Sequence, residues 1–484
     1  MSPNAILLLI AGYFLVLILI ARMTSKKADN DGFFVGNRKS PWYVVAFGMI
    51  GASLSGVTFI SVPGWVGSSQ FSYMQMVLGY VPGYFVIAFV LLPLYYRLQL
   101  TSIYTYLRDR FGRYSYKTGA SYFLLSRVIG AAFRLYLVAM VLQLAVFDRI
   151  GLEVPFALTV FLTVFLIWLY TFRGGIKTII WTDTLQTAFM LLAVGISVYS
   201  ISSSLGLDAS GVIEKVGDSE YSRIFFFDDV NDSRHFLKRF LAGMFITITM
   251  TGLDQDMMQK NLSCRNLKEA QKNMITFSLV LVVVNLVFLT LGALLFIFSH
   301  ENGLAIPEKT DELYPLLAVD GYLGPAVGIL FVLGLIAAAY SSADSALTAL
   351  TTSYSIDILE VDKLDEKTAK KKRARVHIAM SFVLIAVILL FRVINNDSVI
   401  AQLFTAAGYT YGPLLGLYAF GLFTKRKVID RLVPLVAILS PVLSFILDIY
   451  SAKLFGGYEI GFEILLINGA ITYFGLWLIR WSEK

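Results

Sequence analysis

Two stretches of this chain decide its fold. The first is Ala46-Phe-Gly-Met-Ile-Gly-Ala-Ser-Leu-Ser-Gly-Val-Thr58, and the second is Thr247-Ile-Thr-Met-Thr-Gly-Leu-Asp-Gln-Asp256. Each lies inside a long apolar run, yet each is rich in glycine and hydroxyl side chains, which disfavour a straight helix. Close packing against a neighbouring helix is the alternative use of such small residues. Because the two stretches form a matched pair, we predict two helices that are broken near their middle.

Apolar runs of membrane-spanning length fill most of the remaining sequence. Hydrophobic residues make up 57% of the 484 residues and charged residues 15%, which lies outside the range of soluble globular chains. This composition excludes a disordered chain, a disulfide scaffold and a soluble multidomain enzyme. A membrane helix needs about 20 mostly apolar residues. We count thirteen such runs, at 4–22, 42–66, 74–98, 119–147, 154–172, 177–203, 236–258, 274–299, 322–356, 376–394, 398–423, 432–450 and 460–480.

The distribution of basic residues predicts the orientation of these helices. Most of the 40 lysine and arginine residues follow the odd-numbered runs, and the positive-inside rule places those loops in the cytoplasm. We count Lys260 among the basic residues of the loop after the seventh run. The basic segment from Lys370 to Arg375 lies between two membrane helices and is interpreted as a topology anchor, not as a nucleic-acid site. We expect an integral protein of a bacterial inner membrane, with its N-terminus outside and its C-terminus in the cytoplasm.

The two broken runs also predict an internal repeat. They cross the bilayer in opposite directions, and their starts are five helices apart, as in an inverted repeat whose halves each begin with a discontinuous helix. The predicted divisions are an extra N-terminal helix (1–24), a first repeat (41–203), an extracytoplasmic loop (204–234), a second repeat (235–424) and two peripheral C-terminal helices (428–484).

Polar side chains inside the apolar runs indicate an ion site. In the ninth run, Ser341, Ser345, Thr348 and Thr352 fall on one helix face, and Ser342 and Asp344 flank that face. Hydroxyls and freed carbonyls supply the oxygen ligands that a hard cation prefers. The buried carboxylates of Asp183 and Asp344 each require a bound cation or a basic partner, and Arg127 and Arg134 are the competing structural partners.

Four motifs resemble those of the sodium:solute symporter family, which includes the sodium cotransporters of sugars, proline, sialic acid and monocarboxylates. They are Gly174-Gly175-x5-Trp181-Thr182-Asp183-x2-Gln186, the Ser341-Ser342 pair, the Gly-Ala-Ser-Leu-Ser break of the second run and Asp254-Gln255-x3-Gln259. The resemblance covers essentially the whole chain. It implies an all-α membrane protein of about thirteen helices, with a leucine-transporter-like five-plus-five inverted repeat, one extra N-terminal helix and two extra C-terminal helices.

The resemblance also implies where sodium binds. The family's common sodium position takes the carbonyl oxygens of Gly51, Leu54 and Ala338 and the hydroxyls of Ser341 and Ser342. A second sodium position, present in some members, takes Asp183 and Ser345, with Thr182 and Asp344 as contributors. Positions that the resemblance assigns to the solute are Ser53, Ser55, Thr58, Gln75, Arg134, Asp254 and Gln255.

We therefore predict sodium-coupled import of a small polar solute, such as a sugar, a sugar acid or another carboxylate, by alternating access. A proton-coupled symporter is the main alternative, because Asp183, Asp254 and Asp344 are able to carry protons. A non-transporting membrane sensor on the same fold and an intramembrane enzyme are further alternatives. We expect no enzymatic activity and a protein that works as a monomer in the lipid bilayer, with sodium and a small-molecule solute as its partners and no nucleic acid.

Overall fold

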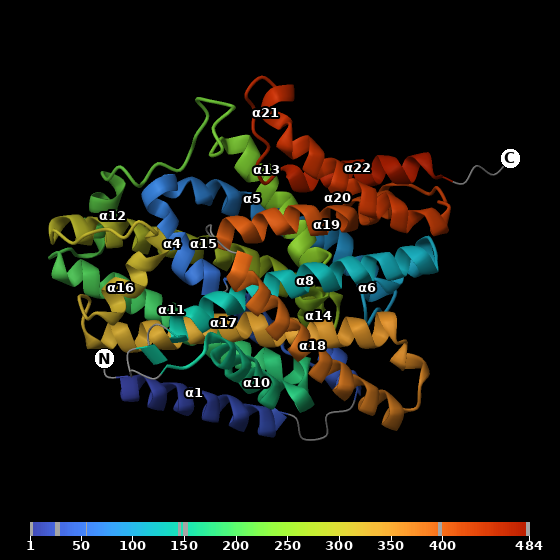
Figure 1. Ribbon diagram of the computed structural model, residues 1–484, viewed down its shortest axis with the longest axis horizontal. Helices are drawn as coiled ribbons and strands as arrows, with labels where there is room; N and C mark the ends of the chain where they lie inside the picture. The colour runs from blue at the N-terminus through green and yellow to red at the C-terminus, as the bar shows by residue number, and fades with distance from the viewer. Residues whose placement is uncertain are drawn as a thin grey trace.

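The chain is built from helices along the part that the structure describes. The computed structural model describes residues 3–24, 30–54, 56–143, 147–148, 153–394 and 399–480, and it contains no strand within them beyond two isolated bridges (Figure 1). A helix satisfies its backbone hydrogen bonds within its own segment, which is the requirement that hydrocarbon surroundings impose. The all-α prediction is confirmed.

Helices occupy every one of the apolar runs. The longer ones are α1 (Pro3–Thr24), α8 (Arg113–Leu142), α10 (Phe156–Gly174), α11 (Ile176–Ser204), α15 (Leu267–Glu301), α17 (Pro325–Ser353), α18 (Glu366–Ile394), α19 (Val399–Phe423), α20 (Val433–Ile449) and α22 (Ile464–Leu478). Shorter ones are α2 (Asn30–Val35), α5 (Tyr73–Val86), α6 (Leu92–Arg97), α7 (Thr105–Arg110), α12 (Ala209–Gly217), α16 (Leu313–Val319) and α21 (Ser451–Leu454).

Helix length alone accounts for fewer membrane spans than the sequence predicts. Within the described residues, six helical segments are long and apolar enough to cross a membrane, and a bent pair makes up to seven. Several other runs are divided into pieces or fall short of the required length, so their helices fail such a test individually. The total of thirteen spans stays a prediction.

Both decisive stretches interrupt their helices. In the first, α3 (Trp42–Ser53) ends before α4 (Gly56–Ser69) begins. In the second, α13 (Phe236–Thr247) passes into a turn of π-helix at Ile248–Gly252, and α14 (Gln255–Leu262) then leaves at an angle of 64°. Asp254 starts α14 by accepting hydrogen bonds from the backbone N–H groups of Asp256 and Met257, as N-cap residues do. The prediction of two broken helices is confirmed.

The broken helices lie inside the bundle, and other helices surround them. Helix α11 packs against α3 and α17, α15 packs against α3, α4 and α5, and α5 packs against α13. In Figure 1, α1 runs along one edge of the molecule, whereas α20 and α22 lie with α19 toward the opposite edge. The sites at the breaks are therefore enclosed by protein.

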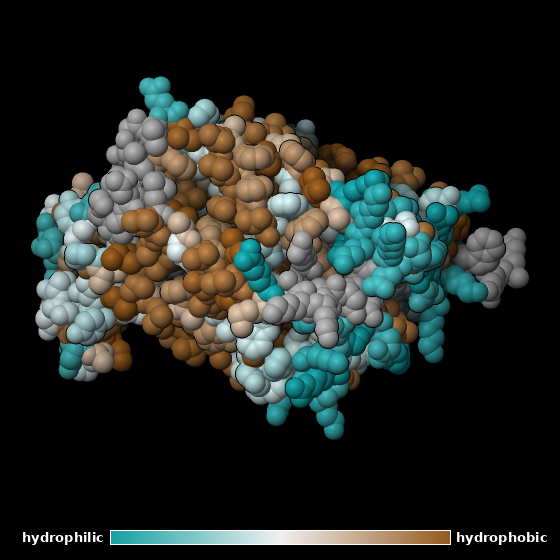
Figure 2. Space-filling model, turned by 90° about the horizontal axis from the view of Figure 1, so that it is seen from below, coloured by the Kyte–Doolittle hydropathy of each residue, from teal (hydrophilic) through white to brown (hydrophobic). Residues whose placement is uncertain are grey.

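The outer surface has the pattern of a protein that spans a bilayer. Figure 2 shows a broad apolar area between two more polar ends. Large apolar side chains are exposed on helices from both ends of the chain, including Leu15 at 59%, Leu390 at 58% and Phe445 at 53%. Lipid tails cover such a surface at no cost in apolar hydration, whereas a soluble protein rarely exposes so large a patch.

Candidate ion and solute site

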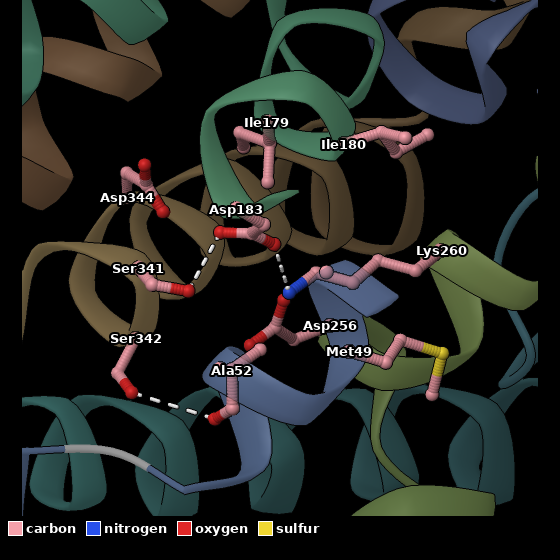
Figure 3. Close-up of polar contacts among 12 residues, drawn as sticks. Met49, Ala52, Ile179, Ile180, Asp183, Asp256, Lys260, Ser341, Ser342 and Asp344 are labelled. Atoms are coloured by element: carbon pink, nitrogen blue, oxygen red, sulfur yellow. Dashed lines mark hydrogen bonds and ion pairs between the residues drawn. The ribbon is translucent and has the colours of Figure 1, made fainter. Parts of the chain in front are cut away.

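The first break meets α17 at a pair of serines. The hydroxyl of Ser342 donates to the carbonyl oxygen of Ala52 in the last turn of α3, at 3.4 Å (Figure 3). A helix C-terminus leaves backbone carbonyls without partners inside the helix, so their oxygens are available at this point. Gly51 lies so close to α11 that a Cβ there would approach Thr187 Oγ1 to 2.3 Å. The residues implied as ligands of the common sodium position thus come from two helices that meet here.

The two carboxylate oxygens of Asp183, on α11, contact side chains of two other helices. The hydroxyl of Ser341 donates to Asp183 Oδ1 at 2.7 Å, and Lys260 Nζ lies 2.7 Å from Oδ2 (Figure 3). Asp183 is 0% and Lys260 1% exposed. Counting Lys260 as a loop residue was wrong, because the bend before α14 turns this helix into the bundle. The basic partner of Asp183 is Lys260, neither Arg127 nor Arg134.

Of the other residues implied for a second sodium position, Asp344 and Thr182 have contacts of their own, whereas the buried hydroxyl of Ser345 makes no hydrogen bond with the described residues. Tyr170 donates to Asp344 Oδ2 at 2.8 Å, while Oδ1 makes no hydrogen bond with the described residues. Thr182 Oγ1 donates back to the carbonyl of Ile179 at 3.1 Å, within its own helix. Ser345 is 1% exposed on α17. Both carboxylate oxygens of Asp183 are therefore engaged, whereas Asp344 keeps one oxygen available.

A cavity opens beside both breaks. It has a volume of about 90 Å³, is partly open to the outside, and lies between α3, α4, α5, α8, α13, α14, α15 and α19. Three of the positions implied for the solute line it, namely Ser53, Thr58 and Arg134. Ser55 lies outside the described residues.

Arg134 is the notable side chain of this cavity. It projects from α8, is 8% exposed, and its Nε makes no hydrogen bond with the described residues. The described ion pairs include none to Arg134, so the alternative of a salt bridge to a buried aspartate is wrong for the residues described. A buried guanidinium without a carboxylate is costly. Its geometry suits a bidentate contact with an anionic ligand.

Three of the residues implied for the solute instead make hydrogen bonds to other parts of the protein. Gln75 Nε2 donates to the carbonyl of Arg234 at 2.8 Å, and Gln255 Nε2 donates to that of Thr101, also at 2.8 Å. Asp254 caps α14, accepts a hydrogen bond from Tyr411 and lies 3.9 Å from Arg127. None of the three lines the cavity beside the breaks. Gln75 thereby joins α5 to the segment before α13, whereas Gln255 and Asp254 hold the start of α14 to its neighbours.

Arg127 also lines the cavity but already has carboxylate partners. It forms an ion pair with Asp256 and approaches Asp254. These contacts join α8 to the second break. The alternative in which Arg127 pairs with Asp183 or Asp344 is wrong.

Sequence reasoning missed several residues of the cavity wall. These are Tyr73, Tyr80, Tyr84, Thr247, Thr251 and Asn285. The two threonines lie in the second decisive stretch, so its density of hydroxyls was a usable signal. Nothing in the pattern around the tyrosines or Asn285 distinguishes them from core residues, because the rotation of each helix is set by its packing.

Comparison with known proteins agrees with the resemblance seen in the motifs. The profile of the sodium:solute symporter family matches residues 33–429. The sodium/sialic acid symporter SiaT of Proteus mirabilis is 25% identical over 95% of this chain and 93% of its own length. NanT of Aliivibrio fischeri, a sodium/sialic acid symporter, is also 25% identical, over 86% and 83% of the two chains. The human sodium/iodide cotransporter is 24% identical, over 87% of this chain and 65% of its own length.

Solved structures share the same fold. A substrate-bound, outward-open Na⁺-coupled sialic acid symporter superposes with a TM-score of 0.81, at 21% identity, over 98% of this chain and 97% of its own. Mhp1, a nucleobase-cation-symport-1 family transporter, superposes with a TM-score of 0.58 at 14% identity, over 93% and 94% of the two chains. Together with a family profile that spans most of the sequence, these matches show that the chain belongs to the sodium:solute symporter family and is a sodium-coupled solute symporter.

Proposed function

We propose that this protein imports a hydroxylated carboxylate, such as a sialic acid or another sugar acid, together with sodium. The observation that carries the choice of solute is Arg134, a buried guanidinium that faces the cavity without a carboxylate partner. An anionic solute supplies that partner. Ser53 and Thr58 offer hydroxyls on the same wall. The sialic acid symporters among the relatives transport a solute of this chemical class.

The sodium ion of this proposal binds where α3 ends against α17. Its ligands are the carbonyl oxygens of Gly51, Leu54 and Ala338 and the hydroxyls of Ser341 and Ser342. The contact between Ser342 and Ala52 supports this position, because it brings one α17 hydroxyl to a carbonyl at the end of α3. A site made of carbonyls and hydroxyls binds a monovalent cation without a large buried charge.

A second sodium ion, held by Asp183 and Ser345 with Thr182 and Asp344, requires a rearrangement. In the structure Lys260 and Ser341 occupy the oxygens of Asp183. Lys260 comes from α14, the second half of a broken helix. Movement of α14 would release one carboxylate oxygen of Asp183 to a second ion.

Transport in this proposal follows alternating access between two five-helix repeats, 41–203 and 235–424, flanked by 1–24 and 428–484, with 204–234 as an outer loop. Sodium and solute raise each other's affinity by the same factor, as linkage requires. Inward movement of each net positive charge gains about 2.3 kcal/mol per 100 mV of membrane potential. We place the protein as a monomer in a bacterial inner membrane, with the N-terminus outside and the C-terminus in the cytoplasm.

Uptake into proteoliposomes tests the proposed solute. We expect sodium-driven uptake of radiolabelled N-acetylneuraminate by the native protein and a loss of roughly 10- to 100-fold in apparent affinity in Arg134→Gln, since hydrogen bonds to charged groups contribute about 1.5–3 kcal/mol. Arg113→Gln is the control, because Arg113 begins the same helix and its side chain is 79% exposed.

Equal uptake by the native protein and Arg134→Gln would contradict the role of Arg134. Uptake that follows a pH gradient without sodium would favour the proton-coupled alternative.

A further inference from the structure

Asn285 presents a buried hydrogen-bond acceptor at the cavity wall. Its Nδ2 donates to the carbonyl of Leu281, one turn earlier in α15, at 2.8 Å. This bond fixes the amide orientation, because a reversed amide would place two acceptors together. Asn285 Oδ1 makes no hydrogen bond with the described residues, although the side chain is only 1% exposed and lines the cavity. The large majority of buried side-chain polar atoms have a partner, so this acceptor is suited to a ligand.

Asn285 and Arg134 reach the cavity from different sides. Helix α15 packs against α3, α4 and α5, whereas α8, which carries Arg134, packs against α17, α18 and α19. Two polar groups on different walls contact different parts of one bound molecule. The group that Asn285 contacts is therefore distinct from the carboxylate that Arg134 contacts.

The chemistry of the two groups is also different. Arg134 offers only donors, which suit a carboxylate. The oxygen of Asn285 offers only lone pairs, so it accepts from a hydroxyl or an amide N–H and repels a carboxylate. A plain alkyl chain leaves this acceptor unpaired when it displaces water from the cavity, which weakens its binding.

We propose that Asn285 is a specificity-determining residue that accepts a hydrogen bond from a hydroxyl or amide N–H of the solute, and thereby selects hydroxylated or acylaminated carboxylates over plain ones. The inference rests on the proposed import of a carboxylate. It adds to that proposal a second anchor and a reason for rejecting fatty acids and other simple carboxylates.

Binding of two carboxylates to purified protein in sodium chloride tests this inference. N-acetylneuraminate carries hydroxyl and amide donors, whereas hexanoate carries only the carboxylate. We expect Asn285→Leu, which keeps the side-chain size, to lower the affinity for N-acetylneuraminate roughly tenfold and to raise that for hexanoate, because the variant leaves no acceptor unpaired beside the alkyl chain. Sodium-dependent thermal stabilisation without solute should be unchanged.

Asn302→Leu is a matched control. Asn302 lies at the end of the same helix and donates to the carbonyl of Phe298 at 2.8 Å, as Asn285 does to that of Leu281, but it is exposed and lies outside the cavity. This variant removes an equivalent donor bond without removing a cavity acceptor. Its binding of both solutes should match that of the native protein.

Several results would overturn the inference. If Asn285→Leu binds N-acetylneuraminate as tightly as the native protein does, Asn285 contacts only water and not the solute. Equal losses for both solutes would show a structural role. If Asn285→Leu does not fold, the affinities of the native protein for the two solutes provide the test. Hexanoate bound as tightly as N-acetylneuraminate would contradict the proposed selection. A native protein that binds neither carboxylate in sodium refutes the proposed function, and the inference with it.

Discussion

At the scale of single residues, the ion pair between Lys260 and Asp183 joins α14 to α11 beside the α3 break. Both side chains are at most 1% exposed, and Asp183 also orients Ser341. Removing one partner of a buried pair leaves the other charge uncompensated, at a cost of about 3–5 kcal/mol. We expect Lys260→Met to lower the unfolding temperature strongly in a thermal melt of the detergent-purified protein.

Two further variants separate charge pairing from other effects. Lys268→Met removes a positive charge from an exposed position close by and should melt like the native protein. Lys260→Met combined with Asp183→Asn removes both charges and should recover part of the loss. A single variant as stable as Lys268→Met would show that the pair contributes little.

The residues of the site differ in how far the sequence revealed them. Ser342, Thr58 and Arg134 carry signals, because serine pairs, hydroxyls at a break and arginines inside an apolar run are all conspicuous. Lys260 was wrongly assigned to the loop after the seventh run. It lies just beyond an apolar run, and the sequence does not reveal the bend that turns α14 into the bundle. Gln75 and Gln255 were assigned to the solute. The backbone carbonyls to which they donate are distant in the sequence, so these contacts could not be predicted from it.

At the scale of elements, the contact between α5 and α13 depends on two glycines. A Cβ at Gly243 would lie 2.1 Å from the carbonyl oxygen of Met76, and one at Gly79 would lie 2.1 Å from that of Phe240. The opposing atoms belong to the backbone and do not move aside as a side chain does. The two helices are therefore held at a distance that admits no larger residue.

Gly243→Ala should push these helices apart and destabilise the protein by about 1–3 kcal/mol, the usual cost of overpacking. Gly195→Ala is the matched control, because Gly195 also lies within a helix but a Cβ there meets nothing within 4 Å. Alanine is the better helix former, so this control should melt at or slightly above the native temperature. Identical melting of the two variants would contradict the close approach of α5 and α13.

Hydropathy located the helices well, and the small-residue stretches located the two breaks. The breaks were predictable because glycine and hydroxyl residues concentrate there. The turn of π-helix at Ile248–Gly252 and the 64° bend were not, since both depend on what surrounds the chain. The parts of the cavity wall on α5 and α15 were also not predictable, because Tyr80 and Asn285 face the cavity only as a result of how these helices are rotated.

At the scale of the whole molecule, the predicted orientation in the membrane has a direct test. The chain contains one cysteine, Cys264, which is 0% exposed, so it should contribute little background when an added cysteine is labelled. In intact cells, a membrane-impermeant maleimide should label Asp229→Cys in the outer loop and leave Lys371→Cys unlabelled. Both positions are exposed in the structure. Labelling of Lys371→Cys alone would show that the orientation is reversed.

The central claim is that sodium binds where α3 ends against Ser341 and Ser342 of α17. The most direct measurement compares thermal unfolding of the purified protein in sodium chloride and in choline chloride, for the native chain and for Ser342→Ala. A ligand at 100 times its Kd stabilises the folded state by about 2.7 kcal/mol, so we predict a higher melting temperature in sodium that is largely lost in Ser342→Ala. Sodium stabilisation of the same size in both proteins would contradict this position for the ion.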